Sequence, residues 1–342
     1  MAVTGERYTE ARRSAGQELP EVQPYFIALV SGQIGLAGHG ASIRDVRTGA
    51  VTDMVKPPPG DTRFNAVTSA GGGVFFLTGW SFGDRDANDP ADPGRTDRRS
   101  IRTDRVRRYR LRVDKNGRAS ELEPLPDDLL PTQMPCHIAA CPGGETLAYS
   151  SSLALTRATV HTTQAGLVYP ASGQRTRVSL PAGRLGDLSW AGDRRTVAFT
   201  WHPVGQEPGV YVADSSAGNW VTGGRLVEAT LGLPGTMMDP QISADGSEIY
   251  CTVAEGDPRG GTHWNRLLAV PVRGGKHRVL FELRYRPDSY NLHYMWTTTC
   301  RDITTGRFLL VFSTGYVYRI EVQSAKFDRL PFPEGRPMTA AW

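Results

Sequence analysis

The chain has 342 residues, of which 39% are hydrophobic and 22% are charged, the balance of a folded protein long enough to bury a sizeable core. Its formal net charge of +4 is small for this length and does not call for a nucleic acid or an anionic membrane as partner. No stretch approaches the roughly 18 apolar residues of a membrane span, and the N-terminal residues lack the apolar segment of a secretory signal, so we expect a cytoplasmic protein.

Residues 1–23 precede the first recognisable strand and form an N-terminal extension. Tyr8, Ala11, Ala15 and Leu19 recur at steps of three and four residues, which is the spacing of one face of a short amphipathic helix. Such a helix would pack on the rest of the chain or dock a partner. An extension with no role is the alternative.

A repeated phrase follows, in which a strand, a Gly- or Asp-containing turn and a second apolar strand succeed one another. It reads "AACPGGETLAYSS" from Ala139, "LSWAGDRRTVAFTW" from Leu188 and "QISADGSEIYCTV" from Gln241, with looser versions from Val67 and Thr297. Gly and Asp supply the backbone conformations of tight turns, and the β-branched and aromatic residues favour strands. Each unit continues into a second hairpin, so four strands per unit are predicted.

One equivalent apolar position marks the second strand of each unit. The positions are Phe26, Val74, Leu147, Val197, Ile249 and Phe308, at intervals of 48, 73, 50, 52 and 59 residues. Four-stranded propeller blades repeat at roughly 40 to 50 residues. The interval of 73 contains a polar, proline-punctuated segment, residues 81–105, which we interpret as an insertion in the second blade. The chain is therefore predicted to be all-β, a six-bladed β-propeller over residues 24–342, with seven blades as the alternative.

The first blade lacks a first strand, because the chain enters directly at an apolar second strand that begins near Tyr25. The C-terminal residues 338–342, "MTAAW", resemble the "GDLSW" that precedes a repeat turn. Placing this tail beside residues 25–30 would close the ring and remove an open sheet edge. Trp342 would then occupy the place of Cys141, Trp190 and Ser243 in other blades.

The repeated phrases resemble the PD40/TolB-like and WD40-like β-propeller repeats, written S-x-D-G-x-x-I/L-A-Y/F. Residues 24–342, including the closing "AAW", are similar to propeller proteins abundant in high-GC bacteria. The sequence departs from true WD40 repeats because no Trp-Asp dipeptide or Gly-His pair recurs, and from TolB because it shows no exported N-terminal domain. Many such proteins carry a membrane segment before the propeller, and none is present here. The family has no shared catalytic motif, so the resemblance implies a fold and assigns no site residue.

Polar side chains are predicted at one level of the central channel, which the first strand of each blade lines. The aligned positions are Asn65, His137, Gly186, Asp239, Trp296 and Met338, with Arg184, Asp187 and His293 beside them. A histidine near a carboxylate can act as a general base with an orienting acid, here His137 with Asp239 or Asp187. The same groups could hold a divalent cation, or simply hydrate the channel.

Aromatic and histidine side chains gather in the loops that join second to third strands. Three tryptophans and two histidines are expected there, around the channel mouth: Trp80, Trp201, Trp264, His202 and His263. Exposed aromatic side chains mark ligand and protein contacts. The alternative is that these rings pack under the loops.

The insertion offers two further motifs. Its acidic part resembles the opening of a calcium loop through Asp84, Asp86, Asn88 and Asp92. An EF-hand needs Gly at the sixth position and Glu at the twelfth, where this chain has Asp89 and Arg95, so a solvated loop is expected. Its basic part comprises Arg95, Arg98, Arg99, Arg102, Arg105, Arg107, Arg108, Arg110 and Arg112. These could contact phosphates, but neighbouring aspartates partly neutralise them, and arginines on the exposed face of an outer strand are the simpler interpretation.

The sequence predicts a non-catalytic binding or scaffold protein. Its upper face, which carries the loops between second and third strands, and its channel mouth would bind a protein or a small polar ligand. A lyase or hydrolase that uses His137 is the alternative. No G-x-S-x-G, H-E-x-x-H, Walker or G-x-G-x-x-G motif occurs, and we expect no cofactor and a monomer. The four cysteines form no CxxC pair and are predicted to be reduced core thiols.

Overall fold

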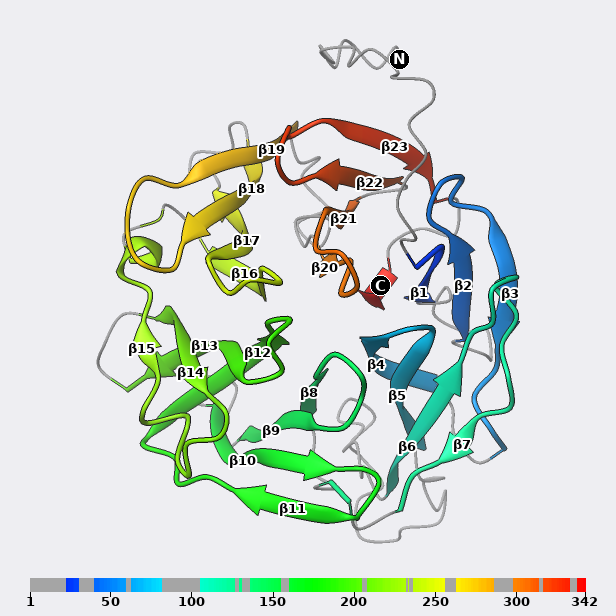
Figure 1. Ribbon diagram of the computed structural model, residues 1–342, viewed down its shortest axis with the longest axis horizontal. Coiled ribbons are helices and arrows are strands. Elements are labelled where there is room, and N and C mark those ends of the chain that lie inside the picture. The colour runs from blue at the N-terminus through cyan, green and yellow to red at the C-terminus, as the bar shows by residue number, and fades with distance from the viewer. Residues whose placement is uncertain are drawn as a thin grey trace, which may run out of the picture.

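The structure, a computed structural model, describes residues 23–30, 40–59, 63–81, 105–126, 129–130, 136–154, 160–204, 208–231, 233, 236–255, 263–285, 298–313, 316–332 and 337–342. Within these ranges the strands form six four-stranded antiparallel sheets, arranged as blades around a central channel (Figure 1). The prediction of an all-β, six-bladed propeller is confirmed, and the seven-bladed alternative is wrong. No helix in the described ranges is long and apolar enough to span a membrane.

Each blade runs from an inner first strand to an outer fourth strand. The first strands are β24 (Pro337–Ala341), β4 (Arg63–Gly71), β8 (Cys136–Ala140), β12 (Gly183–Trp190), β16 (Thr236–Ile242) and β20 (Thr298–Arg301). The second strands are β1 (Tyr25–Val30), β5 (Val74–Ser81), β9 (Leu147–Ala154), β13 (Thr196–Pro203), β17 (Glu248–Glu255) and β21 (Phe308–Ser313). The third strands are β2 (Ala41–Asp45), β6 (Arg105–Arg112), β10 (Val160–Tyr169), β14 (Gly209–Asp214), β18 (His263–Pro271) and β22 (Tyr316–Glu321). The fourth strands are β3 (Val51–Val55), β7 (Glu123–Pro124), β11 (Gln174–Arg177), β15 (Arg225–Leu226), β19 (Arg278–Tyr285) and β23 (Phe327–Pro331). A short 3-10 helix, Glu228–Thr230, follows β15.

Apolar side chains from neighbouring blades make the core. Its buried clusters lie between consecutive sheets, for example between the third and fourth blades around Phe199, Trp190 and Trp220. The second strands, such as "FLLVFS" in β21, are nearly continuous apolar runs because blades cover both of their faces. Cys141, Cys251 and Cys300 are buried and free of disulfides, as predicted for core thiols.

The two ends of the described chain meet in one sheet. Strand β24 pairs antiparallel with β1, with Ala341 opposite Ile27 and Thr339 opposite Leu29. Trp342 is only 1% exposed, and its indole N–H donates to the carbonyl of Gln23 at 2.8 Å. In Figure 1 the C-terminus lies at the inner side of the ring beside β1. The predicted closure by the C-terminal strand is therefore confirmed.

The predicted equivalence of Cys141, Trp190 and Ser243 is wrong by one residue. Trp190 pairs with Val197 as the last residue of β12, whereas Cys141 and Ser243 lie one residue beyond the ends of β8 and β16. The hairpin loops have equal lengths and are each closed by a backbone bond, from Cys141 N to Thr146 O, from Ala191 N to Thr196 O and from Ser243 N to Glu248 O. Ala191, not Trp190, is thus the counterpart of Cys141.

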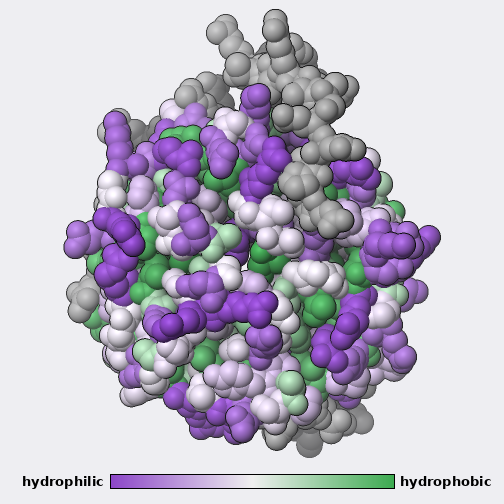
Figure 2. Space-filling model, in the orientation of Figure 1, coloured by the Kyte–Doolittle hydropathy of each residue, from purple (hydrophilic) through white to green (hydrophobic). Residues whose placement is uncertain are grey.

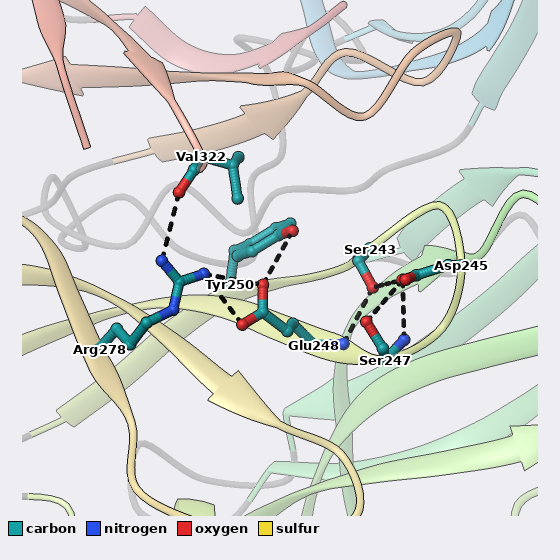
Figure 3. A network of polar contacts seen from close by, with 7 residues as sticks. All are labelled: Ser243, Asp245, Ser247, Glu248, Tyr250, Arg278 and Val322. Carbon is teal, nitrogen blue, oxygen red and sulfur yellow. Dashed lines mark hydrogen bonds and ion pairs between the residues drawn. The ribbon is translucent and has the colours of Figure 1, made fainter. Parts of the chain in front are cut away.

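In the unit that begins at Gln241, the repeated phrase forms an Asp-Gly hairpin turn held by one carboxylate. Asp245 accepts hydrogen bonds from the Ser243 hydroxyl at 2.6 Å, the Ser247 hydroxyl at 2.7 Å and the Ser247 N–H at 3.0 Å (Figure 3). Gly246 follows with φ of +73°, a conformation that glycine adopts without strain. These hydrogen bonds to the charged form lower the pKa of Asp245, so the turn is maintained at neutral pH.

Beyond this turn, a polar network joins the fifth and sixth blades. Glu248 pairs with Arg278 of β19 at 3.0 Å, and Arg278 also donates to the carbonyl of Val322 at 3.4 Å (Figure 3). Burial and the Glu248 charge raise the pKa of Tyr250, whose hydroxyl donates to Glu248. Because the ion pair is partly exposed, we expect at most about 1 kcal/mol from it. The network links the fifth blade to the sixth. It lies beside the hairpin turns between first and second strands, away from the polar groups of the channel mouth.

Candidate functional site

The channel contains a cavity of about 430 Å³ to which all six blades contribute. Its lining comes from the first strands and includes four charged or titratable polar side chains, His137, Asp187, Asp239 and Arg301, together with the buried thiol of Cys300. The described lining also offers a ligand neutral polar side chains, such as those of Asn65 and Gln241. The predictions for His137, Asp187, Asp239 and Asn65 as channel residues agree with this lining.

Irregularities in three inner strands lie where polar side chains enter the channel. The strand register shifts between Phe64 and Ala66 in β4, between Leu185 and Leu188 in β12, and between Met238 and Gln241 in β16. A β-bulge inserts a residue and re-aims the side chains beside it, and such bulges occur frequently next to functional sites. Here they contain Asn65, Asp187 and Asp239, which line the cavity.

His137 and Asp187 form a pair across two blades. Nδ1 of His137 lies 3.2 Å from Oδ1 of Asp187, and the two side chains are 38% and 36% exposed. Burial in the channel acts to raise the pKa of Asp187. The hydrogen bond and charge of His137, the backbone N–H of Asp239 and the charge of Arg184 outweigh it, and the net pKa is lowered. Asp187 is therefore an anion at neutral pH and fixes the orientation of the imidazole.

Asp239 extends this arrangement to the fifth and sixth blades. Its backbone N–H is hydrogen-bonded to Asp187, and its Oδ2 accepts the N–H of Thr299 at 3.3 Å. Its φ of +48° is unusual for a residue other than glycine, although aspartate tolerates it better than most. Strained backbone of this kind concentrates at functional sites. His137, Asp187, Asp239 and Thr299 thus form a connected polar path over four blades.

Gly186 does not line the cavity as predicted, because the bulge in β12 gives that place to Asp187. Gly186 is buried against the second strand of its own blade. A Cβ built on it would lie 2.2 Å from Oγ1 of Thr200, so no larger residue fits without a shift. Asp187, the next residue along the chain, therefore lines the channel with its carboxylate at the level where Gly186 was predicted.

Arg184 and His202 lie beside the channel in the fourth blade and outside the cavity lining. Nη2 of Arg184 is 3.5 Å from Nε2 of His202. Burial and the positive charge of Arg184 lower the pKa of His202, although Asp187 acts in the opposite sense. His202 is therefore a neutral group near pH 7.

Of the tryptophans expected around the mouth, the structure describes the side chains of Trp201 and Trp264, and neither lines the cavity. Trp201 is 6% exposed and packs with Leu185, Phe199 and Trp220, so it belongs to the core between blades. Within the sheet Trp201 pairs with Leu185 on one side and Gly209 on the other. Trp264 lies on β18, outside the cavity lining, half-buried with the guanidinium of Arg266 4.5 Å from its ring centre.

Other predicted site residues fall outside what the structure describes. These are His293, Trp296, Asp84, Asp86, Asn88 and Asp92, together with the side chains of Trp80 and His263. Of the arginine cluster, Arg110 pairs with Glu123 at 2.6 Å on the strand surface, as expected. Arg108 differs from the expectation, since it is buried and does not lie on an exposed face. Within the described ranges no three His, Cys, Asp or Glu side chains are grouped to hold a metal.

Arg301 is the cavity residue that sequence reasoning missed. It ends β20 opposite Leu309, is 5% exposed, and donates from Nη2 to the carbonyl of Trp190 at 2.8 Å. Burial lowers its pKa to about 10, so it remains a cation at neutral pH. A signal exists in the phrase "TTTCRD", where a charge occupies the position that Ala140 and Ile242 hold in other blades.

No protein-family model matches the sequence, and no curated protein is significantly similar to it. Among solved structures, TolB from Acinetobacter baumannii is similar with a TM-score of 0.59 at 13% identity, over 94% of this chain and 67% of that one. The tricorn protease gives a TM-score of 0.49 at 10% identity, over 92% of this chain and 31% of that one. At 13% identity the likeness to TolB shows the fold alone. The chain is a six-bladed β-propeller.

Proposed function

We propose that the protein is a non-catalytic binding protein that holds a small polar ligand in the mouth of its channel. The observation that carries this proposal is the cavity of about 430 Å³ into which Asn65, His137, Asp187 and Asp239 converge from four consecutive blades. A pocket of this size with a few convergent polar groups is the usual form of a small-molecule site.

The chemistry of the mouth favours a ligand rich in hydrogen-bond donors. Asp187 is held as an anion by its partners, and carboxylates accept hydrogen bonds without donating any. An ammonium or hydroxyl group of the ligand would satisfy them. Charge-assisted bonds of this kind are stronger than neutral ones.

The outer surface gives less support to an apolar docking face for a protein partner. On the face shown in Figure 2, hydrophobic residues appear as small areas separated by hydrophilic ones. The exposed large hydrophobic residues of the described chain are dispersed over different blades and comprise Val51, Met54, Val204, Leu231, Val279 and Tyr316. The channel therefore remains the better candidate.

Binding of ethanolamine, which carries both donor types, tests the proposal by ligand-observed NMR. We expect line broadening with the wild-type protein and its loss in Asp187→Asn and Asp239→Asn. Glu123→Gln is the matched control, since it removes one carboxylate that pairs with Arg110 on an outer strand. Equal broadening in all four proteins would count against a site in the channel.

A lyase or hydrolase activity is the second candidate, and the His137–Asp187 contact favours it. Here His137 would be the general base and Asp187 the group that orients it. Mass spectrometry of a bound ligand after long incubation separates the two candidates. A binding protein returns the ligand unchanged, whereas an enzyme converts it and loses that conversion in His137→Gln.

A further inference from the structure

The channel mouth contains a contact that is sensitive to protons. Nδ1 of His137 lies 3.2 Å from Oδ1 of Asp187, and among the described residues this is the one ion-pair contact that Asp187 makes. Both side chains line the cavity and are partly exposed. A ligand bound to the carboxylate in the mouth would therefore lie close to the imidazole as well.

The net charge of this pair depends on the imidazole between about pH 8 and 5.5, the range in which histidine side chains titrate. Asp187 has a lowered pKa and stays an anion over this range. With neutral His137 the pair carries a net negative charge. With protonated His137 the two charges compensate each other. The pair thus attracts a cation in one protonation state and loses that attraction in the other.

The fourth and fifth blades supply the other charges at the mouth. Arg184, exposed on β12, acts on Asp187 through its positive charge. Asp239 on β16 donates its backbone N–H to Asp187 and adds a second carboxylate to the cavity lining. His202 on β13 lies next to Arg184. Burial and the charge of Arg184 lower the pKa of His202, so it takes up a proton at a lower pH than an ordinary imidazole.

The other strands packed against β8 are β4 and β9. In β9 the titratable residue is Tyr149, which is buried and whose hydroxyl donates to the carbonyl of Thr176 at 3.4 Å. In β4 it is Arg63, whose side chain lies outside the described residues. Arg301 also lines the cavity, but its guanidinium donates to a backbone carbonyl of the fourth blade. Among the described residues that line the cavity, His137 is therefore the one imidazole.

We infer that the ligand is a small organic cation of the primary ammonium type, bound by Asp187 and Asp239 in competition with the proton of His137. The inference rests on the proposed function, and it specifies the charge of the ligand and a pH control of the site. Neutral His137 leaves the charge of Asp187 to the ligand, whereas protonated His137 compensates that charge and repels the cation. Ligand and proton therefore weaken the binding of each other by the same factor.

Calorimetry with ethanolamine between pH 8 and 5.5 tests the inference. Its ammonium group stays charged over this range, since alkylammonium groups titrate near pH 10. We expect binding roughly ten-fold weaker at pH 5.5 than at pH 8, a common size for the coupling between two sites. Near pH 6.5, the ordinary value for an imidazole, binding should release part of a proton, which makes the measured heat depend on the ionisation enthalpy of the buffer.

Ethylene glycol is the matched neutral probe, because a hydroxyl group replaces the ammonium group of ethanolamine. Competition against ethanolamine, followed by ligand-observed NMR, measures its affinity. We expect it to bind more weakly than ethanolamine at pH 8 and to show little change with pH, since it gains no attraction from the net negative charge of the pair.

Variants identify the group that carries the proton. His137→Gln keeps a hydrogen-bond donor beside Asp187 but is neutral at every pH, so its affinity for ethanolamine should be nearly the same at pH 8 and 5.5. His277→Gln, at an exposed position between β18 and β19, is the control and should keep the wild-type response. Near-ultraviolet circular dichroism at each pH shows whether a variant is folded. The proton release of the wild-type protein decides the case if His137→Gln does not fold.

If neither probe binds the wild-type protein at any pH, the proposed function and the inference fail together. If ethylene glycol binds as tightly as ethanolamine, or if the affinity for ethanolamine does not change with pH, the proposed function stands and the inference is overturned. The inference is also overturned if His137→Gln keeps the pH response of the wild-type protein.

Discussion

The indole of Trp342 donates its N–H to the carbonyl of Gln23, so the last residue of the chain is hydrogen-bonded to a residue that immediately precedes the first blade. The ring of blades is closed by this contact and by the pairing of β24 with β1. The pairing completes the first blade, and Trp342 packs with Phe26, Phe308 and Ala340 at the junction of the sixth and first blades. A propeller closed in this way has no open edge at its junction.

Truncation of this indole should reduce stability strongly. We expect Trp342→Ala to lower the free energy of unfolding by about 3–5 kcal/mol, the range for removing a buried large side chain. Trp342→Phe should cost less, since the ring is kept and mainly the hydrogen bond of about 1 kcal/mol is lost. Urea denaturation measures both. Val279→Ala, at an exposed position on β19, is the control, and an effect of Trp342→Ala no larger than this control would contradict the closure.

Gly186 and Thr200 should show a coupled effect. Gly186→Ala places a methyl group against Oγ1 of Thr200, and we expect a loss of about 1–3 kcal/mol from overpacking. Thr200→Ala removes the clashing atom, so the double variant should recover most of that loss. A double-mutant cycle by denaturation gives the coupling. Additive effects of the two substitutions would mean that the bulge does not bring these residues together.

The fold was predictable because the repeated phrases encode it locally. Hairpin turns that contain Gly or Asp recur together with apolar second strands, and the tail "MTAAW" supplies the one strand that the first blade lacks. The site was predictable only in part. A bulge does not change the strand-like appearance of "RLGDLSW", so the alignment of first strands placed Gly186 in the channel where the structure places Asp187.

Two other residues show that a sequence pattern does not determine where a side chain lies in the folded protein. An arginine within a strand is usually on a solvated face, so the charge in "TTTCRD" became a signal only once the pairing placed Arg301 at the end of the inner strand. Conversely, Trp201 in "FTWHPVG" was expected at the channel mouth because it lies where a second strand joins a third, but the blade packing buries its ring. Long-range packing, which strand patterns do not encode, decided both cases.

Mild acid should destabilise the protein partly through His202. Burial and Arg184 lower the pKa of His202 in the folded protein, whereas the unfolded imidazole keeps its ordinary value near 6.5. The unfolded chain therefore binds a proton first, and the stabilising contribution, complete above about pH 6.5, is lost as the pH falls towards the folded pKa. His202→Gln should show a smaller loss of stability between about pH 7.5 and 5.5. His277→Gln, in an exposed turn at the opposite end, is the control, and an equal response of both variants would contradict the role of His202.

The positive φ of Asp239 predicts an unusual order of substitutions. Asp239→Ala and Asp239→Gly both remove the acceptor of the Thr299 N–H, but only glycine adopts a φ of +48° without strain. We therefore expect Asp239→Gly to be more stable than Asp239→Ala by roughly 1 kcal/mol. Asp239→Asn, which keeps an acceptor and tolerates this conformation, should be the most stable of the three.

The matched comparison is Asp328 on β23, where substitution by alanine or by glycine removes the ion pair with Arg319. At that regular strand position glycine costs about 0.5–1 kcal/mol relative to alanine, so the order should reverse. The same order at both positions, measured by urea denaturation, would show that the bulge in β16 does not hold Asp239 in this conformation.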